Sequence, residues 1–475
     1  MKESPVIVWF RQDLRLSDND AFLAAVETGA PIIPCFIWAP EEEGAWSPGA
    51  ASRVWLRRSL EALGESLKRR GLRLILRRGP TAVSLSQLIH KTGARGVFWN
   101  RRLEPAVSLR DARIESDLKR DGIEARSWNA SLLVEPALAL NLSGRPYRVF
   151  TPFWKACLKK GFEESREEPR GGLRAPEQWP ASRSIDELEL LPENDWHKGL
   201  AAFWNVGEEA ARRVLQRFAA NRVSAYADDR NTPSLEGTSS LSPHLHFGEI
   251  GPRQVRSALS SGDPCSIGSR VFLNEIGWRE FAHCLLFHFP ESVDRPLKKD
   301  FEHFPWEPND DWLRRWQRGE TGYAIVDAGM RQLWQTGWMH NRVRMIAASF
   351  LVKHLLQPWQ RGAEWFWDTL VDADLACNTL GWQWVAGCGA DAAPFFRVFN
   401  PIAQGEKFDS DGAYVRRWIP ELARMPAAFV HKPWAAPSDV LKEAGVKIGS
   451  TYPAPIVDHK SARARALMAW ERMKL

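Results

Sequence analysis

The pattern of apolar residues changes abruptly along this chain, and the change restricts the folds that it can adopt. Up to about residue 130, short β-rich runs alternate with amphipathic stretches, whereas no strand-like run follows after about residue 200. The strand candidates are PVIVWF (5–10), PIIPCFIW (31–38), LRLILR (72–77), GVFWN (96–100) and IEARSW (123–128). Strands alternating with helical segments predict a Rossmann-like parallel sheet with helices on both faces. We therefore expect an α/β fold joined to an all-α fold.

The sequence further predicts three parts in a chain of 475 residues. Residues 1–130 form the α/β domain, with a helix from Ser52 to Arg70 that Gly71 ends. Residues 131–200 are rich in Pro, Gly and charge, which is typical of an interdomain linker. Residues 201–475 form the helical domain, with apolar-periodic segments at 331–356 and 365–375. The first strand is followed by RQDLRLSDN rather than by a Gly-rich phosphate loop.

Composition excludes few classes of function. The formal net charge of +6 and the pI near 9.0 permit nucleic-acid binding without demanding it. No CxxC pair occurs, so neither a zinc ribbon nor a disulfide scaffold is indicated. The N-terminus is too short and too charged for a signal peptide, and no apolar run reaches membrane-spanning length. We expect a soluble, cytoplasmic protein that does not contact a membrane.

Polar and aromatic side chains recur at helical spacing between residues 275 and 382. Three groups stand three, four or seven residues apart: Glu275, Trp278 and Arg279; Trp338, Asn341, Arg342 and Met345; Asp374, Asn378 and Trp382. Residues so spaced share one face of a helix, and buried carboxylates need hydrogen-bond donors. Three helices with mixed polar and aromatic faces therefore predict a cavity for a flat polar ligand.

Two other patterns carry less weight. Gly387, Gly389 and Ala392 fit a dinucleotide-binding pattern, but they follow a Trp-rich helix rather than a strand, which favours chance. His244 and His246 form an HxH without further ligands at metal spacing. We expect a capping or surface role for these histidines and no metal site.

Several ordered segments resemble the DNA photolyase and cryptochrome family. They run from near the N-terminus to near the C-terminus: WFRQDLRLSDN (9–19), EGTSSLSPHLHFGEI (236–250), LNEIGWREF (273–281), TGWMHNRVRM (336–345), DADLACNTLGWQW (372–384) and NPIAQGEKFD (400–409). The resemblance covers nearly the whole chain and is strongest to class I cyclobutane pyrimidine dimer photolyases. It implies FAD in the helical domain and an antenna-type α/β domain.

The resemblance also assigns residues to the flavin. The hydroxyl-rich turn 238–242 holds the FAD diphosphate, Arg344 pairs with Asp372 beside the ring, Asp374 accepts from the flavin imide, and Asn378 faces flavin N5. The usual DGDLA is DADLA here, so Ala373, like Cys377 and Leu380, departs from the family pattern. The complete set of implied FAD contacts is Tyr226, Thr238, Ser239, Ser240, Leu241, Ser242, Arg279, Asn341, Arg344, Asp372, Ala373, Asp374 and Asn378.

A second implied set faces DNA. Trp278 and Trp384 offer π-faces to a flipped-out dimer, and Glu275 can stabilise a carbonyl oxygen that gains charge. The enzymes that repair (6-4) photoproducts carry a His pair on the helix of Asn341 and Met345, which is not present here. The implied DNA contacts are Arg230, Glu275, Trp278, Asn341, Arg342, Met345, Trp384, Arg397 and Gln404.

Catalysis by the family further implies an electron path and an antenna. Trp382, Trp359 and Trp306 match its electron-transfer chain, and with Glu275 they complete the implied catalytic set. Folate-using members carry an Asn-Glu pair where Ala106 and Val107 stand, so a deazaflavin, a second flavin or no antenna is expected rather than folate. The implied partner is DNA containing pyrimidine dimers, bound by a monomer.

The implied activity is light-driven dimer repair by a deoxyribodipyrimidine photo-lyase, a carbon-carbon lyase. A cryptochrome-type signalling flavoprotein is the main alternative, and a preference for single-stranded DNA is another. An α/β nucleotide-binding module without chemistry would leave the polar and aromatic stripe from Asp372 to Trp384 unexplained.

Overall fold

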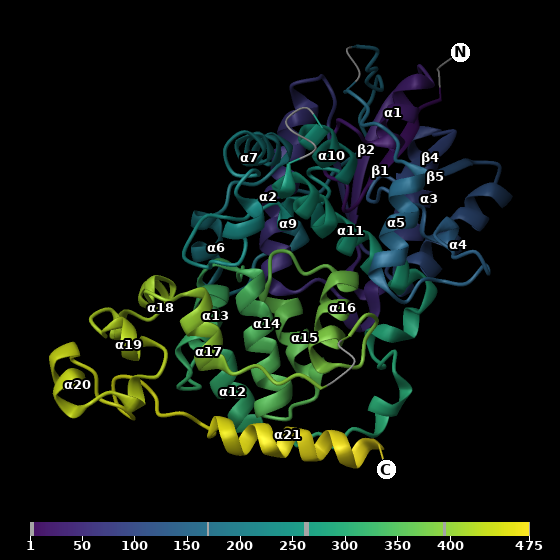
Figure 1. Ribbon diagram of the computed structural model, residues 1–475. Coiled ribbons are helices and arrows are strands. Elements are labelled where there is room, and N and C mark those ends of the chain that lie inside the picture. The colour runs from purple at the N-terminus through teal and green to yellow at the C-terminus, as the bar shows by residue number, and fades with distance from the viewer. Residues whose placement is uncertain (1–3, 169–170, 261–265, 393–395, 475) are drawn as a thin grey trace. The chain divides into compact units, whose positions relative to one another are not determined.

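The computed structural model describes residues 4–168, 171–260, 266–392 and 396–474 (Figure 1). The strands are β1 Val6–Phe10, β2 Ile32–Trp38, β3 Ile75–Arg78, β4 Gly96–Asn100 and β5 Glu124–Trp128. The helices up to residue 300 are α1 Asp20–Glu27, α2 Ala50–Lys68, α3 Thr81–Thr92, α4 Pro105–Arg120, α5 Phe150–Lys160, α6 His197–Phe203, α7 Glu208–Asn221, α8 Tyr226–Asp229, α9 Ser242–His246, α10 Pro252–Ser260 and α11 Ile267–His288. The later helices are α12 Asp310–Arg318, α13 Ala324–Thr336, α14 Asn341–Ser349, α15 Trp359–Thr369, α16 Leu375–Ala386, α17 Pro401–Phe408, α18 Ala413–Trp418, α19 Ala427–Val430, α20 Ser438–Ala444 and α21 His459–Lys474.

The chain forms two compact units. Unit 1 comprises Met1–Ser224, Ser239–Pro290 and Val371–Asp374, and unit 2 comprises Ala225–Thr238, Glu291–Leu370 and Leu375–Leu475. Helix α11, which lies in the predicted helical domain, therefore belongs to the same unit as the sheet. The domain boundaries at 130 and 200 stay a prediction.

Unit 1 is built on a parallel sheet with strand order β3-β2-β1-β4-β5. Helix α1 packs on β1 and β4, α3 on β2 and β3, and α4 on β5 (Figure 1). Strand β1 is buried along its whole length, as expected when helices cover both faces of a parallel sheet. The order reverses between β1 and β4, as in doubly wound folds. The α/β prediction is confirmed, and each strand lies within three residues of its predicted start.

A buried polar network occupies the loop after β1. The Asn100 amide at the end of β4 donates to Asp13 at 2.6 Å, and Arg15 donates to the carbonyl oxygens of Asp18 and Ala130 at 2.7 Å. The Arg11 guanidinium pairs with Asp111 of α4. These charges tie the carboxyl ends of the strands to neighbouring loops, where other doubly wound folds hold a phosphate.

The described part of the predicted linker contains helix α5 and the start of α6, which the sequence analysis missed. Elsewhere in the linker the backbone is bonded to the sheet region: Ile32 donates to the Arg174 carbonyl at 2.8 Å, and Arg183 donates to the Leu76 carbonyl at 3.0 Å. The described part of the segment thus follows the α/β fold closely instead of crossing open solvent.

The described residues of unit 2 form helices joined by loops, with no strand among them, which confirms the all-α prediction. The predicted continuous segment 331–356 is wrong, because α13 ends at Thr336 and Gly337 adopts a φ of +68°. The His340 side chain then caps α14 by accepting from the Arg342 backbone N–H. A π-helix, η6 (Phe350–His354), extends α14. The predicted segment 365–375 is also interrupted, between Leu370 and Asp374.

No helix among the described residues is both long and apolar enough to cross a membrane.

Candidate functional site

In unit 1, α11 carries Glu275 and Trp278 on one face, as the spacing predicts. The helix starts at a Ser266 cap and packs closely on α5, since a Cβ at Gly277 would lie 2.6 Å from the Trp154 ring. The Trp278 ring stacks on Phe150 with centroids 3.9 Å apart and planes 10° apart. Both Glu275 and Trp278 are half-buried. Phe150 fixes the orientation of the indole, and sequence spacing gave no sign of it because it lies in the predicted linker.

The Asp374 carboxylate is held by two histidines of unit 1. Its Oδ2 lies 3.1 Å from His283 Nε2 and 3.9 Å from His246 Nδ1. Burial acts to raise the pKa of Asp374, but His283, His246 and Arg279 together hold that pKa well below its usual range. Asp374 is therefore an ionised acceptor, and it can receive a hydrogen bond from a ligand N–H.

The surface role expected for the HxH histidines is wrong. His244 is 1% and His246 7% exposed. His244 Nδ1 pairs with the Glu249 carboxylate, which also accepts from the Trp55 indole at 3.0 Å. His246 faces Asp374, and the only sequence signal for this was the buried, Pro-started helix that carries it. His283 stands four residues after Arg279 on α11, and this spacing could have indicated that both residues lie on the same helix face.

The hydroxyl-rich turn lies at the start of α9. Ser240 adopts a φ of +56°, and the Ser239 hydroxyl accepts from the Leu241 N–H at 3.3 Å. Leu241 is buried, whereas Ser242 is exposed. The turn thus has the strained geometry of a binding loop. Asp372 and Ala373, the other predicted flavin contacts of unit 1, are buried.

In unit 2, α14 presents Arg342 and Met345 beside each other. Arg342 donates to the Asn231 amide oxygen at 2.6 Å and stacks over the Phe408 ring at 4.4 Å. The helix begins at Asn341, so Trp338 precedes it and does not share its face, contrary to the prediction. Asn341 itself is exposed.

Four arginines of unit 2 lie near one another, and we call them the arginine group: Arg230, Arg342, Arg344 and Arg397. Burial lowers the pKa of Arg342, and Arg230 and Arg397 lower it further. Burial, Arg344, Arg342 and Arg230 lower the pKa of His340 to about 4. Like charges brought together in this way form a site of positive potential that suits an anion.

Helix α16 carries the next part of the predicted site. The Asn378 amide nitrogen donates one of its two N–H groups to the Ala363 carbonyl at 3.0 Å, which orients the amide and leaves its oxygen available as an acceptor. Trp382 is 2% exposed and packs against Phe366 and Trp316, with ring centroids 5.0 and 6.2 Å away. A Cβ at Gly362 would lie 2.1 Å from the Trp382 ring, so α15 and α16 approach without a gap. Asp374 lies just before α16 rather than on it.

The remaining predicted residues of unit 2 are distributed over several elements. Trp359 begins α15 and is 2% exposed, while Trp306 is half-buried and packs on Phe304 at 4.4 Å. Arg397 stacks over Phe399 at 5.0 Å, and Gln404 lies on α17. The Arg230 guanidinium lies 5.3 Å from the ring of buried Tyr226.

Unit 1 therefore brings together Asp374, Arg279 and two histidines, and unit 2 brings together the arginine group. The ionised carboxylate and the Asn378 oxygen are the kind of acceptors that the N–H groups of a flavin ring require. Predicted pairs whose members belong to different units, such as Arg344 with Asp372, stay predictions.

Comparison with known proteins gives consistent matches over the chain. A family model described as DNA photolyase matches residues 6–170, and one described as the FAD binding domain of DNA photolyase matches residues 272–472. The chain is 50% identical to the deoxyribodipyrimidine photo-lyase of Agrobacterium fabrum, over 100% of this chain and 99% of that protein. It is 41% identical to Cryptochrome-1 of Arabidopsis thaliana, over 98% of this chain and 70% of that protein.

A solved structure agrees with these matches. The crystal structure of a bacterial class III photolyase from Agrobacterium tumefaciens has 49% sequence identity and a TM-score of 0.96, and the match covers 100% of this chain and 98% of that one. The predicted class I subfamily is therefore not confirmed. Since two family models and a relative of 50% identity span it, this chain belongs to the DNA photolyase and cryptochrome family and is a flavoprotein that binds FAD.

Proposed function

We propose that the protein repairs cyclobutane pyrimidine dimers in DNA under blue light. The observation that carries the proposal is the pairing of Glu275 with an indole, Trp278, held in place by Phe150 on one face of α11. A flipped-out dimer offers a flat surface to the indole and carbonyl oxygens to the carboxyl group. A signalling flavoprotein would need neither group.

The flavin contacts follow from the acceptors already described. Asp374, held ionised by His283 and His246, would accept from the flavin imide, and the Asn378 oxygen would face N5. Reduced FAD, when bound, supplies the electron that splits the dimer after light is absorbed. The chain binds and orients the dimer: Trp278 and Trp384 stack on it, Glu275, once it carries a proton, donates to a carbonyl oxygen, and the arginine group binds phosphates.

Glu275 and Trp278 have separable roles, which gives the test. We expect Glu275→Ala to lower the quantum yield of repair more than the affinity for dimer DNA, since its hydrogen bond strengthens as charge develops. Trp278→Ala should weaken binding by roughly 1–3 kcal/mol through lost stacking. Binding is measured by fluorescence anisotropy, and repair is measured by chromatography with chemically pre-reduced protein.

The matched control is Glu302→Ala, which removes an exposed carboxylate elsewhere. The role assignment fails if Glu275→Ala mainly weakens binding and Trp278→Ala mainly lowers the yield. Absence of repair by the pre-reduced wild-type protein would favour the cryptochrome alternative, which the 41% identity to a plant cryptochrome supports. The same assay with single-stranded and duplex substrates would reveal a strand preference.

Trp382, Trp359 and Trp306 are proposed to supply electrons to oxidised FAD. Trp382→Phe keeps the packing against Phe366 but raises the oxidation potential of the ring. We expect slow photoreduction of the oxidised variant by an external reductant and normal repair by the pre-reduced variant. Loss of repair in the pre-reduced variant, with FAD content unchanged, would instead assign Trp382 to the substrate step.

An antenna other than folate is proposed for the α/β domain. Val107 is completely buried, and Ala106 beside it lies in the first turn of α4, so neither position offers a polar anchor. A deazaflavin or a second flavin is favoured. Extraction of chromophores from the purified protein, followed by absorption spectroscopy, tests this, and recovered folate would contradict it.

A further inference from the structure

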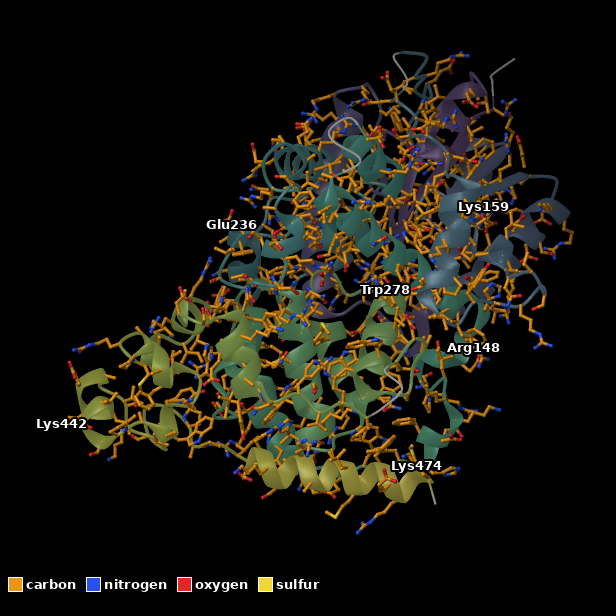
Figure 2. All side chains as sticks on the ribbon, in the orientation of Figure 1. Arg148, Lys159, Glu236, Trp278, Lys442 and Lys474 are labelled. Atoms are coloured by element: carbon orange, nitrogen blue, oxygen red, sulfur yellow. The ribbon has the colours of Figure 1, made fainter. Side chains whose placement is uncertain are left out.

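A cavity of about 220 Å³ lies in unit 2, where the C-terminal end of α16 and the last turn of α21 approach each other. Its lining includes Trp384 and Arg397, two residues proposed to contact DNA, but most of the lining comes from side chains to which no role has been given. Helix α21 runs along this side of unit 2 and ends at Lys474, labelled in Figure 2.

Positive charge dominates the cavity. Its basic lining residues are Lys298, Lys353, Arg397 and Lys474, and its acidic lining residue is Asp300. The net charge is therefore +3 with Lys353 protonated and +2 with Lys353 neutral. Lys298, Arg397 and Lys474 are exposed, whereas Lys353 is 1% exposed. A cavity with this balance attracts an anion.

A purely structural role accounts for part of this charge. Lys353 donates to the Ala386 carbonyl at 2.7 Å, and Lys298 donates to the Gly387 carbonyl at 3.1 Å, so both ammonium groups cap α16. Each ammonium group has three donors, and one carbonyl uses only one of them. Burial and the charge of Lys298 lower the pKa of Lys353 well below its usual range, a shift that a bound anion would oppose.

Ser349, the last residue of α14, is not explained by helix capping. Its side chain is 2% exposed and lines the cavity. Within the described residues its hydroxyl has no hydrogen-bond partner. A buried hydroxyl is almost always bonded, because leaving it unbonded costs free energy. The hydroxyl is therefore a second and independent indication of a ligand.

Aromatic rings form the rest of the wall. Phe396 and Trp470 stack with centroids 5.8 Å apart and planes 9° apart, and Lys353 Nζ lies 3.0 Å from the Phe396 centroid. Flat rings beside cations are the combination that binds a base together with its phosphate. Inorganic phosphate alone would not need the aromatic wall.

We propose that this cavity binds the phosphate and base of one nucleotide, with Ser349, Lys298 and Lys474 as the phosphate donors. The nucleotide comes either from a DNA strand that passes Trp384 and Arg397 or from a free mononucleotide. The first source rests on the proposed function, since it requires DNA on this face of unit 2.

The test uses the full-length protein, Ser349→Ala and Lys474→Gln, with Lys442→Gln on α20 as the matched control. Lys442 is exposed and lies on a different helix of unit 2 (Figure 2). One probe is an undamaged, 5′-phosphorylated single-stranded oligothymidylate, and the other is thymidine monophosphate. Binding is measured by calorimetry and by anisotropy at several salt concentrations.

If the strand supplies the nucleotide, Ser349→Ala weakens oligonucleotide binding about tenfold through a lost hydrogen bond to a charged group. Lys474→Gln then also lowers the slope of log K against log salt by about 0.7, while the mononucleotide does not bind. If the source is free, the mononucleotide binds saturably, and Ser349→Ala abolishes that binding.

The proposal is overturned if both variants bind both probes as Lys442→Gln does. It is also overturned if Lys474→Gln alone has an effect, because a general surface field would then suffice. Dimer repair by the wild-type protein, measured in parallel, separates this result from the proposed function. If the protein binds the probes but does not repair dimers, the proposed photolyase function is wrong and the proposed nucleotide site is retained.

Discussion

The buried arginines of unit 1 and the arginine group of unit 2 have opposite electrostatic surroundings. In unit 1, Arg11 meets Asp111, and Arg253 meets Asp18 and Asp20, so buried cations face carboxylates. In unit 2, Arg342 contacts the neutral groups of Asn231, Met345 and Phe408, while Arg230 and Arg397 lie near enough to lower its pKa. Matched charge holds a fold together, whereas like charges held near one another store repulsion that an incoming anion relieves. We therefore assign a structural role to the buried arginines of unit 1 and a binding role to the arginine group of unit 2.

The largest expected effect comes from breaking a matched pair in unit 1. Asp111 accepts from Arg11 and from Arg110, so Asp111→Asn leaves the buried Arg11 guanidinium without its carboxylate, while Arg110 keeps its ion pair with Glu42. Loss of one partner of a buried pair costs about 3–5 kcal/mol. Denaturant unfolding should show this loss of stability, and DNA affinity under folding conditions should be unchanged. A stability change below about 1 kcal/mol would remove the distinction between the units.

The second prediction concerns the arginine group. Arg342→Ala should weaken DNA binding by about 1.5–3 kcal/mol, the worth of a charged hydrogen bond, and should reduce the salt dependence by about one phosphate contact. Stability should be maintained, because repulsion from Arg230 and Arg397 is removed with the side chain. Paired titrations and unfolding curves check this. A variant that unfolds early but binds DNA normally would make Arg342 structural.

Glu280 is an exception within unit 1 and predicts a pH dependence. Burial raises the pKa of this carboxyl to about 7, although Arg279 and the N–H groups of Leu133 and Val134 oppose the shift. The pKa of Glu280 is higher in the folded protein than in the unfolded chain. Its contribution to the free energy of unfolding is therefore complete below about pH 4.3 and is lost as pH rises through 7. We expect a loss of about 2.5 kcal/mol between pH 5 and pH 8.

Glu280→Gln imitates the protonated form and serves as the matched variant. Its free energy of unfolding should lack this component of pH dependence and exceed that of the wild type at pH 8. Parallel pH profiles for the two proteins would show that Glu280 does not titrate in this range.

The smallest expected effect comes from a matched pair in solvent. Arg166 pairs with Glu27, and their side chains are 45% and 63% exposed. Glu27→Ala should change stability by less than about 0.5 kcal/mol, since water screens the pair. Thermal unfolding beside Asp111→Asn measures the contrast directly. A loss comparable to that of Asp111→Asn would mean that burial does not decide what a charge pair contributes.

The sheet could be predicted from sequence because its signals are local. Each strand is a short apolar run between turn residues, and pairing simply follows from the alternation with helices. The helix break at Gly337 was also local and could have been predicted, since a glycine after a helical run commonly ends it. Spacing alone made 331–356 look continuous because the apolar period resumes after the break.

The partners of the site residues could not be predicted in the same way. His246 and His283 lie far from Asp374 in the sequence, yet both lie beside its carboxylate in the fold. Phe150 stacks on Trp278 but belongs to the charged segment 131–200, in which the sequence did not indicate a helix. Spacing identifies which residues share a helix face, but only the tertiary fold decides what that face meets. The implied positions came from resemblance, and their electrostatic state came from the structure.

Gly362 limits the substitutions that α15 and α16 can tolerate. Any larger residue there would place its Cβ 2.1 Å from the Trp382 ring, so the helix pair would separate or the indole would have to be lost. A mutation at 362 therefore cannot be neutral for the tryptophan, even though the glycine touches no ligand. Loss of the indole alone would not make room for a side chain at position 362, because Leu351 Cδ2 would still lie 2.7 Å from that Cβ.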